Sequence, residues 1–133
     1  MAYDTKFQAT LSLPAAGDLS NFQFYPVTVT TSATYPDGAI TTISSTATKP
    51  IGILQDTPSA AGVMAAVVVA GISKVRAYTG TVNPMDSLGV NANGYGEVTT
   101  TDNRWVLGDV MDTAATDANV VAVLTVNVNV HRY

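Results

Sequence analysis

Hydrophobic and polar residues alternate along several segments of the chain with a period of two residues. The clearest examples are residues 7–13, 27–30 and 124–130, where every second residue is apolar and the others are Thr, Ser, Gln or Asn. This alternation is typical of a half-buried β-strand. In no window do hydrophobic residues recur every 3.6 residues over three helical turns, so the pattern predicts an all-β chain. Turn signals separate the predicted strands: Pro36-Asp37-Gly38, Asn83-Pro84, Asn93-Gly94 and Thr101-Asp102-Asn103.

An uncharged apolar block covers residues 60–72. It is shorter than the about 20 residues that a transmembrane helix needs, so it does not predict a membrane span. Its run of valines, residues 67–69, favours a strand, because β-branched side chains lose rotamer freedom in a helix and pack well on a sheet. We predict a buried strand over residues 63–70, with turns at Gly62 and Gly71.

These patterns predict a single domain of the barrel or sandwich type. Residues 1–18 are expected to form an extended N-terminal arm or the first strand, and residues 19–133 a single all-β domain. At most one short helix is expected, and residues 112–118 are the best candidate for it. A chain of 133 residues is long enough to bury a core in one such domain.

Two segments of the chain resemble each other, residues 51–69 and residues 107–125. Gly52 matches Gly108, and Asp56-Thr57 matches Asp112-Thr113. In each segment a short strand leads through an Asp-Thr turn and a loop of small residues into a valine-rich strand. We predict two related hairpins near each other in one barrel. Chance similarity in a chain rich in valine and alanine is the alternative.

Composition narrows the possible functions. The chain is 47% hydrophobic and only 12% charged, which argues against disorder. It has no cysteine, so disulfides and thiolate metal sites do not stabilise it. The net charge is −4 and the six Lys and Arg residues are scattered, whereas a nucleic-acid-binding protein needs a clustered basic surface. No basic segment precedes an apolar stretch at the N-terminus, so no secretory signal is expected.

Candidate chemistry is sparse. The single histidine, His131, lies near the C-terminus, where a solvated side chain is a simpler interpretation than a catalytic one. Asp109, Asp112 and Asp117 could bind calcium, but they lack the spacing of an EF-hand loop, so turn capping is the simpler role. With Glu97 as the only glutamate and no cysteine, we expect no catalytic, cofactor or metal site and no enzyme activity.

The order of elements over residues 50–126 resembles a known family. A Gly52-Ile53-Leu54 strand precedes a small-residue loop and the valine-rich strand. Further strands are expected at residues 71–77 and 108–110, with the segment at residues 82–90 between them. This succession is similar to that of the capsid decoration (cement) proteins of tailed bacteriophages. Many of these proteins have Gly-Asp-x-Leu where this chain has Met85-Asp86-Ser87-Leu88. A different turn is therefore expected at Met85.

The resemblance implies a compact β-barrel-like or β-tulip domain and a structural role in the virion. Such proteins sit as homotrimers on the outer surface of an icosahedral phage head and bind the major capsid protein. We expect no cofactor, no nucleic acid and no membrane as a partner. A carbohydrate- or surface-binding β-domain of a virion or cell-surface protein is the alternative function.

Six residues are candidates for protein contacts. In an extended N-terminal segment that adds a strand to a neighbour, Tyr3, Lys6 and Phe7 are expected to contact the capsid, unless this segment is simply the first strand of the barrel. Subunit-interface candidates are Lys74, Arg76 and Trp105. The two cations are separated by one residue and so lie on the same face of the predicted strand. Solvation of this face, or protection of the strand against edge pairing, is the alternative to a subunit contact. Trp105 fits a core position or an interface anchor; sugar stacking, together with Tyr78 and Tyr95, is the alternative.

Overall fold

A computed structural model describes residues 9–77, 80–100, 104–111, 114–116 and 121–132, with side chains over 9–77, 82–100 and 104–111. These residues form strands, turns and loops, and no helix lies among them, which confirms the predicted all-β class. The described part of the chain therefore holds no helix that could cross a membrane. The strands are β1 Ala9–Pro14, β2 Pro26–Thr30, β3 Ala39–Thr42, β4 Gly52–Leu54, β5 Met64–Arg76, β6 Gly80–Val82, β7 Ser87–Val90, β8 Gly96–Val98, β9 Trp105–Val110, β10 Ala114–Thr116 and β11 Val121–Arg132.

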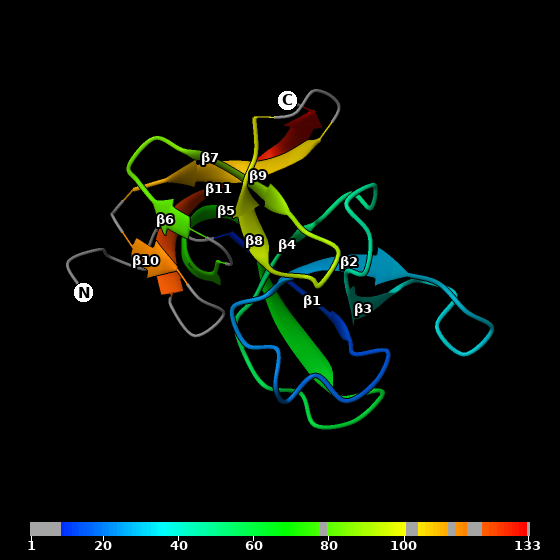
Figure 1. Cartoon of the computed structure of the whole chain (residues 1–133). Helices are drawn as coiled ribbons and strands as arrows, with labels where there is room; N and C mark the ends of the chain where they lie inside the picture. Colours follow the sequence, from blue (N-terminus) through cyan, green and yellow to red (C-terminus); the bar gives the residue numbers. More distant parts are fainter. Residues whose placement is uncertain (1–8, 78–79, 101–103, 112–113, 117–120, 133) are drawn as a thin grey trace.

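The main sheet has nine strands and is organised around the long strand β5 (Figure 1). Its order is β3-β2-β4-β5-β11-β9-β7-β8, and β1 also pairs with β5. The first half of β5 pairs with β1 and β4, and the second half pairs with β11. The strand β5 therefore belongs to two groups of strands, β1 to β4 on one side and β7, β8, β9 and β11 on the other.

A single bridge closes each strand group on itself. Ala15, after β1, bridges to Ile40 in β3, and Ala77, after β5, bridges to Gly96 in β8. The Ala16 amide also donates to the Ile40 carbonyl at 2.9 Å. The sheet is therefore curled in a barrel-like manner on both sides of β5. A separate two-stranded sheet, β6 with β10, completes the described structure.

The predicted buried strand over residues 63–70 is present from Met64 onward as part of β5, but Val63 and Met64 are exposed, and the predicted end of the strand is wrong. Gly62, with a φ of 88°, lies in the turn before β5, as predicted. Gly71 is not in a turn: it lies within β5 with a φ of 105° and pairs with Val126. Glycine accepts this backbone conformation without a Cβ penalty. It allows one strand to continue from its β1 and β4 partners to β11.

The predicted helix over residues 112–118 is also wrong. Residues 114–116 form β10, which pairs in antiparallel fashion with β6. A helix this short gains few internal hydrogen bonds after a costly nucleation step. Pairing with β6 supplies backbone partners to the same residues.

The two similar segments form two adjacent hairpins. The strands β4 and β5 make one and β9 and β11 the other, and they lie side by side in the order β4-β5-β11-β9. Their registers differ by one position. Leu54 pairs with Val67, whereas its counterpart Val110 pairs with Leu124 and not with Val123.

The core follows the two strand groups. Val67 and Val68 are neighbours on β5, and their side chains lie in different buried clusters because successive residues of a strand point to opposite faces. The second half of β5 contributes Val75 to the cluster that contains Val68. The first cluster contains Ile53, Val68, Val75, Ala77, Val82, Leu88, Leu107 and Val110, and the second contains Ala15, Leu19, Val27, Ile40, Leu54, Ala65 and Val67.

Candidate interaction surfaces

Two cations and three aromatic residues gather near the second half of β5. We call this group, Phe24, Tyr25, Lys74, Arg76 and Tyr95, the basic–aromatic surface. Lys74 and Arg76 are two residues apart on β5 and so share one face of the strand. Lys74 is exposed, and its Nζ lies 5.6 Å from the centroid of the Phe24 ring, within cation–π range.

Phe24 reaches this place through an unusual backbone conformation. Its φ is 66°, a left-handed value that is rare for a bulky residue. Its N–H donates to the Leu54 carbonyl at 2.8 Å, and its carbonyl accepts from the Arg76 amide at 2.8 Å. These bonds tie the segment before β2 to both β4 and β5, and they offset the cost of the left-handed conformation.

Tyr25 is the centre of the aromatic contacts. Its ring lies 5.1 Å from Phe22 in an edge-to-face arrangement and 5.0 Å from Tyr95 in a tilted one. Burial, followed by the hydrogen bond and the charge of Tyr95, raises the pKa of Tyr25 to about 12, and the positive charge of Arg76 opposes this shift. Tyr25 is therefore protonated at neutral pH and can donate a hydrogen bond.

The predicted turn at Asn93-Gly94 holds Tyr95 in position. The buried Asn91 accepts hydrogen bonds through Oδ1 from the amides of Asn93 and Tyr95, both at 3.0 Å. Gly94 has a φ of 85°, and a Cβ there would lie 2.8 Å from the Ile43 carbonyl oxygen. The turn thus needs glycine, and it fixes the approach of Tyr95 to Tyr25.

Trp105 has different neighbours. It is half-buried at the start of β9, and its Nε1 donates to the Ala47 carbonyl at 3.1 Å. The Lys49 ammonium lies 5.1 Å from its ring centroid. Trp105 therefore anchors the loop before β4 within its own chain. With Lys49 over the ring, Trp105 offers less of its surface to a stacked sugar.

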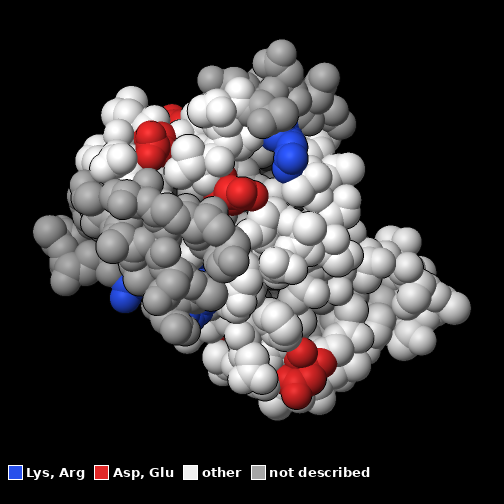
Figure 2. Space-filling view, in the orientation of Figure 1, with Lys and Arg blue, Asp and Glu red and all other residues white. Residues whose placement is uncertain are grey.

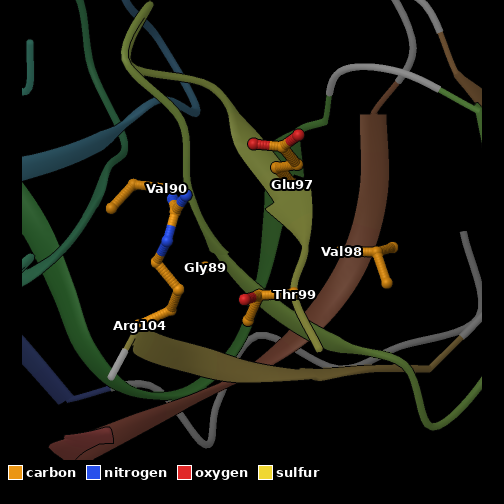
Figure 3. Close-up of a pocket in the computed structure, with 6 residues that line it drawn as sticks. All are labelled: Gly89, Val90, Glu97, Val98, Thr99 and Arg104. Carbon is orange, nitrogen blue, oxygen red and sulfur yellow. The ribbon is translucent and has the colours of Figure 1, made fainter. Parts of the chain in front are cut away.

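A small pocket lies between β7, β8 and the residue before β9 (Figure 3). Its volume is about 70 Å³, and Figure 3 shows the Arg104 side chain extending toward Val90. Ligand pockets usually measure about 300–1,000 Å³, so this one does not fit a sugar ring. Its lining residues are Gly89, Val90, Glu97, Val98, Thr99 and Arg104.

The carboxylates considered for calcium do not come together in the described residues. Asp109 is exposed on β9, and its Oδ1 accepts from the Ser87 hydroxyl at 3.4 Å. Asp112, Asp117 and the side chain of His131 lie outside the described part of the chain. Within the described part, no group of three or more His, Asp or Glu residues could hold a metal ion.

Among the described residues on the face shown in Figure 2, charged side chains are few and lie apart from one another. Among the side chains that the structure describes, three large apolar ones are exposed: Val63 by 43%, Met64 by 55% and Met85 by 78%. Met85 has a φ of 73°, so it adopts the left-handed conformation that glycine prefers. A different turn was expected at Met85 because many decoration proteins have glycine at this position. The backbone of Met85 nevertheless has the conformation that a glycine would favour.

Comparisons with known proteins give one informative result. No model of a protein family matches the sequence, and no curated protein matches it. Among solved structures, the N base of the head fibre protein gp8.5 of bacteriophage phi29 is similar, with a TM-score of 0.66. The chain has the fold of this fibre base. The similarity covers 94% of this chain and 100% of that chain at 12% sequence identity, so it concerns the fold.

The predicted contact residues fall into three places. Tyr3, Lys6 and Phe7 lie outside the described residues, as does Tyr78. Lys74 and Arg76 lie together with aromatic rings, whereas the Trp105 indole is held by Lys49 and Ala47. Sequence reasoning missed Phe24 and Tyr25. The only signal for them was the aromatic-rich run at residues 22–25.

Proposed function

We propose that this protein is a structural component of a phage virion that attaches to the outer surface of the icosahedral head. The observation that carries the proposal is the fold, which matches the whole N base of a phage head fibre. The order of elements over residues 50–126, which resembles that of capsid decoration proteins, independently supports a place on the head. We further propose that the protein is a homotrimer that binds and stabilises the lattice of the major capsid protein.

Such a role needs surfaces and not chemistry. A trimer uses one head-to-tail contact three times, and attachment needs a second surface that faces the shell. The described structure offers a basic–aromatic surface for one contact and exposed apolar residues, Met64 and Met85 among them, for others. We assign neither an enzymatic reaction nor a cofactor, nucleic acid or membrane to this protein.

The proposal is tested by sedimenting the purified protein with empty heads of the phage that encodes it. We expect the protein to pellet with the heads and to saturate at a fixed ratio to the major capsid protein. Failure to bind any head preparation would overturn the proposal.

The expected contact residues Tyr3, Lys6 and Phe7 can be tested in the same assay with a deletion of residues 1–8. The deletion should stop before Ala9, because β1 pairs with β5 from that residue onward. We expect head binding to weaken by at least about tenfold, equivalent to about 1.4 kcal/mol, while the thermal unfolding midpoint stays unchanged. If the deletion variant binds heads as tightly as the full-length protein, Tyr3, Lys6 and Phe7 do not contribute to the contact.

Carbohydrate binding remains a second candidate because Tyr25 and Tyr95 are half-buried and not fully covered. Aromatic rings that face solvent can stack on sugars. A glycan array probed with the purified protein tests this function. Binding that is lost in Tyr95→Ala would support it.

A further inference from the structure

We infer that the basic–aromatic surface binds the β2–β3 loop, residues 31–38, of a second copy of this chain. This inference rests on the proposed homotrimer and names the contact that would build it. The two surfaces lie on different parts of the molecule. In Figure 1 the β2–β3 loop extends at the right edge, whereas the second half of β5 lies on the left. Such a pair makes a head-to-tail contact, which is the type that closes into a ring.

Charge is the first argument for a second copy as the occupant. Each chain carries −4, so a contact that joins a cation of one copy to a carboxylate of another reduces the repulsion between copies. Lys74 and Arg76 are two of only six cations in the chain, and they stand two residues apart on one strand. Asp37 is exposed and is the only charged residue between Asp18 and Lys49. The loop thus presents a single negative charge on an otherwise neutral segment.

The loop is also ordered before it binds. The Ser32 amide donates to the Tyr35 carbonyl at 3.2 Å, and the Tyr35 amide donates to the Ser32 hydroxyl at 3.1 Å. The Gly38 amide donates to the same Tyr35 carbonyl at 3.2 Å, and Gly38 has a φ of 110°. A loop held by its own hydrogen bonds loses little conformational entropy when it docks.

The chemistry of the two surfaces is complementary. Tyrosine and arginine are enriched at the energetic centres of protein interfaces, and both occur in the basic–aromatic surface. Pro36 and Asp37 are neighbouring exposed residues of the loop, one apolar and one acidic. Pro36 suits the half-buried rings of Tyr25 and Tyr95, while Asp37 suits the Lys74 ammonium.

The test is a charge-swap cycle read by sedimentation velocity over a range of protein concentrations. Lys74→Glu and Asp37→Lys should each raise the concentration for half-assembly by at least about tenfold, because each places like charges together. The double variant, which restores one opposite pair, should return to within about threefold of the wild type. Assembly of the wild type should also weaken as salt rises from about 0.05 to 0.5 M.

Lys49→Glu is the matched control, since it makes the same charge change at an exposed lysine outside the surface. Combined with Asp37→Lys, it should not restore assembly. The unfolding midpoint of each variant shows that lost assembly is not lost folding. The inference is overturned if Lys74→Glu and Asp37→Lys assemble like the wild type, if the double variant is no better than either, or if the wild type is monomeric. A monomer that still pellets with heads would leave the proposed attachment intact.

Discussion

Gly52→Ala tests the packing between β4 and β5, and with it the central position of β5 in the sheet. A Cβ at Gly52 would lie well inside 3.0 Å of the Val68 carbonyl oxygen and 2.8 Å from the Cγ1 of Val67. The first atom belongs to the main chain of β5, and Val68 pairs with Ile53 in β4 and Thr10 in β1. The backbone cannot move away from the new methyl group without breaking these pairings.

The expected cost follows from this geometry. Overpacking a close-packed core costs about 1–3 kcal/mol, and a clash with backbone belongs at the upper end of that range. For a chain of this length, about 3 kcal/mol lowers the thermal unfolding midpoint by about 10 °C. Circular dichroism during heating, with urea unfolding as a second measurement, gives both quantities.

Gly17→Ala is the matched control, because a Cβ at Gly17 meets no atom within 4 Å. It should be neutral, or stabilising by up to about 1 kcal/mol through its effect on the unfolded chain. If Gly52→Ala unfolds at the same temperature as Gly17→Ala, the close approach of β4 to β5 is wrong, and with it the central position of β5.

Two further predictions concern single residues. Met85→Gly should raise the free energy of unfolding by up to about 1 kcal/mol, because Met85 is exposed and has a left-handed backbone that glycine adopts without a Cβ penalty. Met64→Gly is the control and should lower the free energy of unfolding, because Met64 is equally an exposed methionine but lies in a strand. Equal effects of the two substitutions would contradict this reasoning. Tyr25 binds its proton more tightly in the folded state than in the unfolded state. Its contribution to the free energy of unfolding is therefore fully present below pH 10 and is lost as the pH rises from about 10 to 12. Tyr25→Phe should flatten that part of the pH profile measured by urea unfolding, and an unchanged slope would refute the assignment.

The sequence predicted the strands well where side chains alternate. Val27 and Val29 lie in β2, where the alternation placed a strand. The run of valines at residues 67–69 lies in β5, as its β-branched composition predicted. The two related hairpins were predictable because both carry the same succession of glycine, small residues and valines. A period of two is a direct consequence of the pleat, so it needs no knowledge of tertiary structure.

The errors came from residues whose role depends on distant partners. Gly71 signals a turn locally, yet its pairing with Val126 keeps it inside β5. The short segment at residues 114–116 has no decisive pattern of its own, and pairing with β6 decides its structure. Cross-strand partners of this kind override weak local propensities.

The candidate surface was predicted only in part. Lys74 and Arg76 could be found because they alternate on one predicted strand. Tyr25 and Tyr95 could not be paired from sequence, because the contact between their rings depends on the left-handed Phe24 and the turn at Gly94. The turn at Gly94 was predicted, but the left-handed conformation of Phe24 was not, because nothing in the local sequence indicates it for a bulky residue.

The central claim, that this protein is mechanically attached to the outside of a phage head, is tested most directly by electron cryomicroscopy of empty heads with and without the added protein. We predict new density on the outer surface only, at repeated positions with threefold symmetry, into which three copies of the β-domain fit. Heads that look the same in both samples at saturating protein, or density confined to the interior, would contradict the claim.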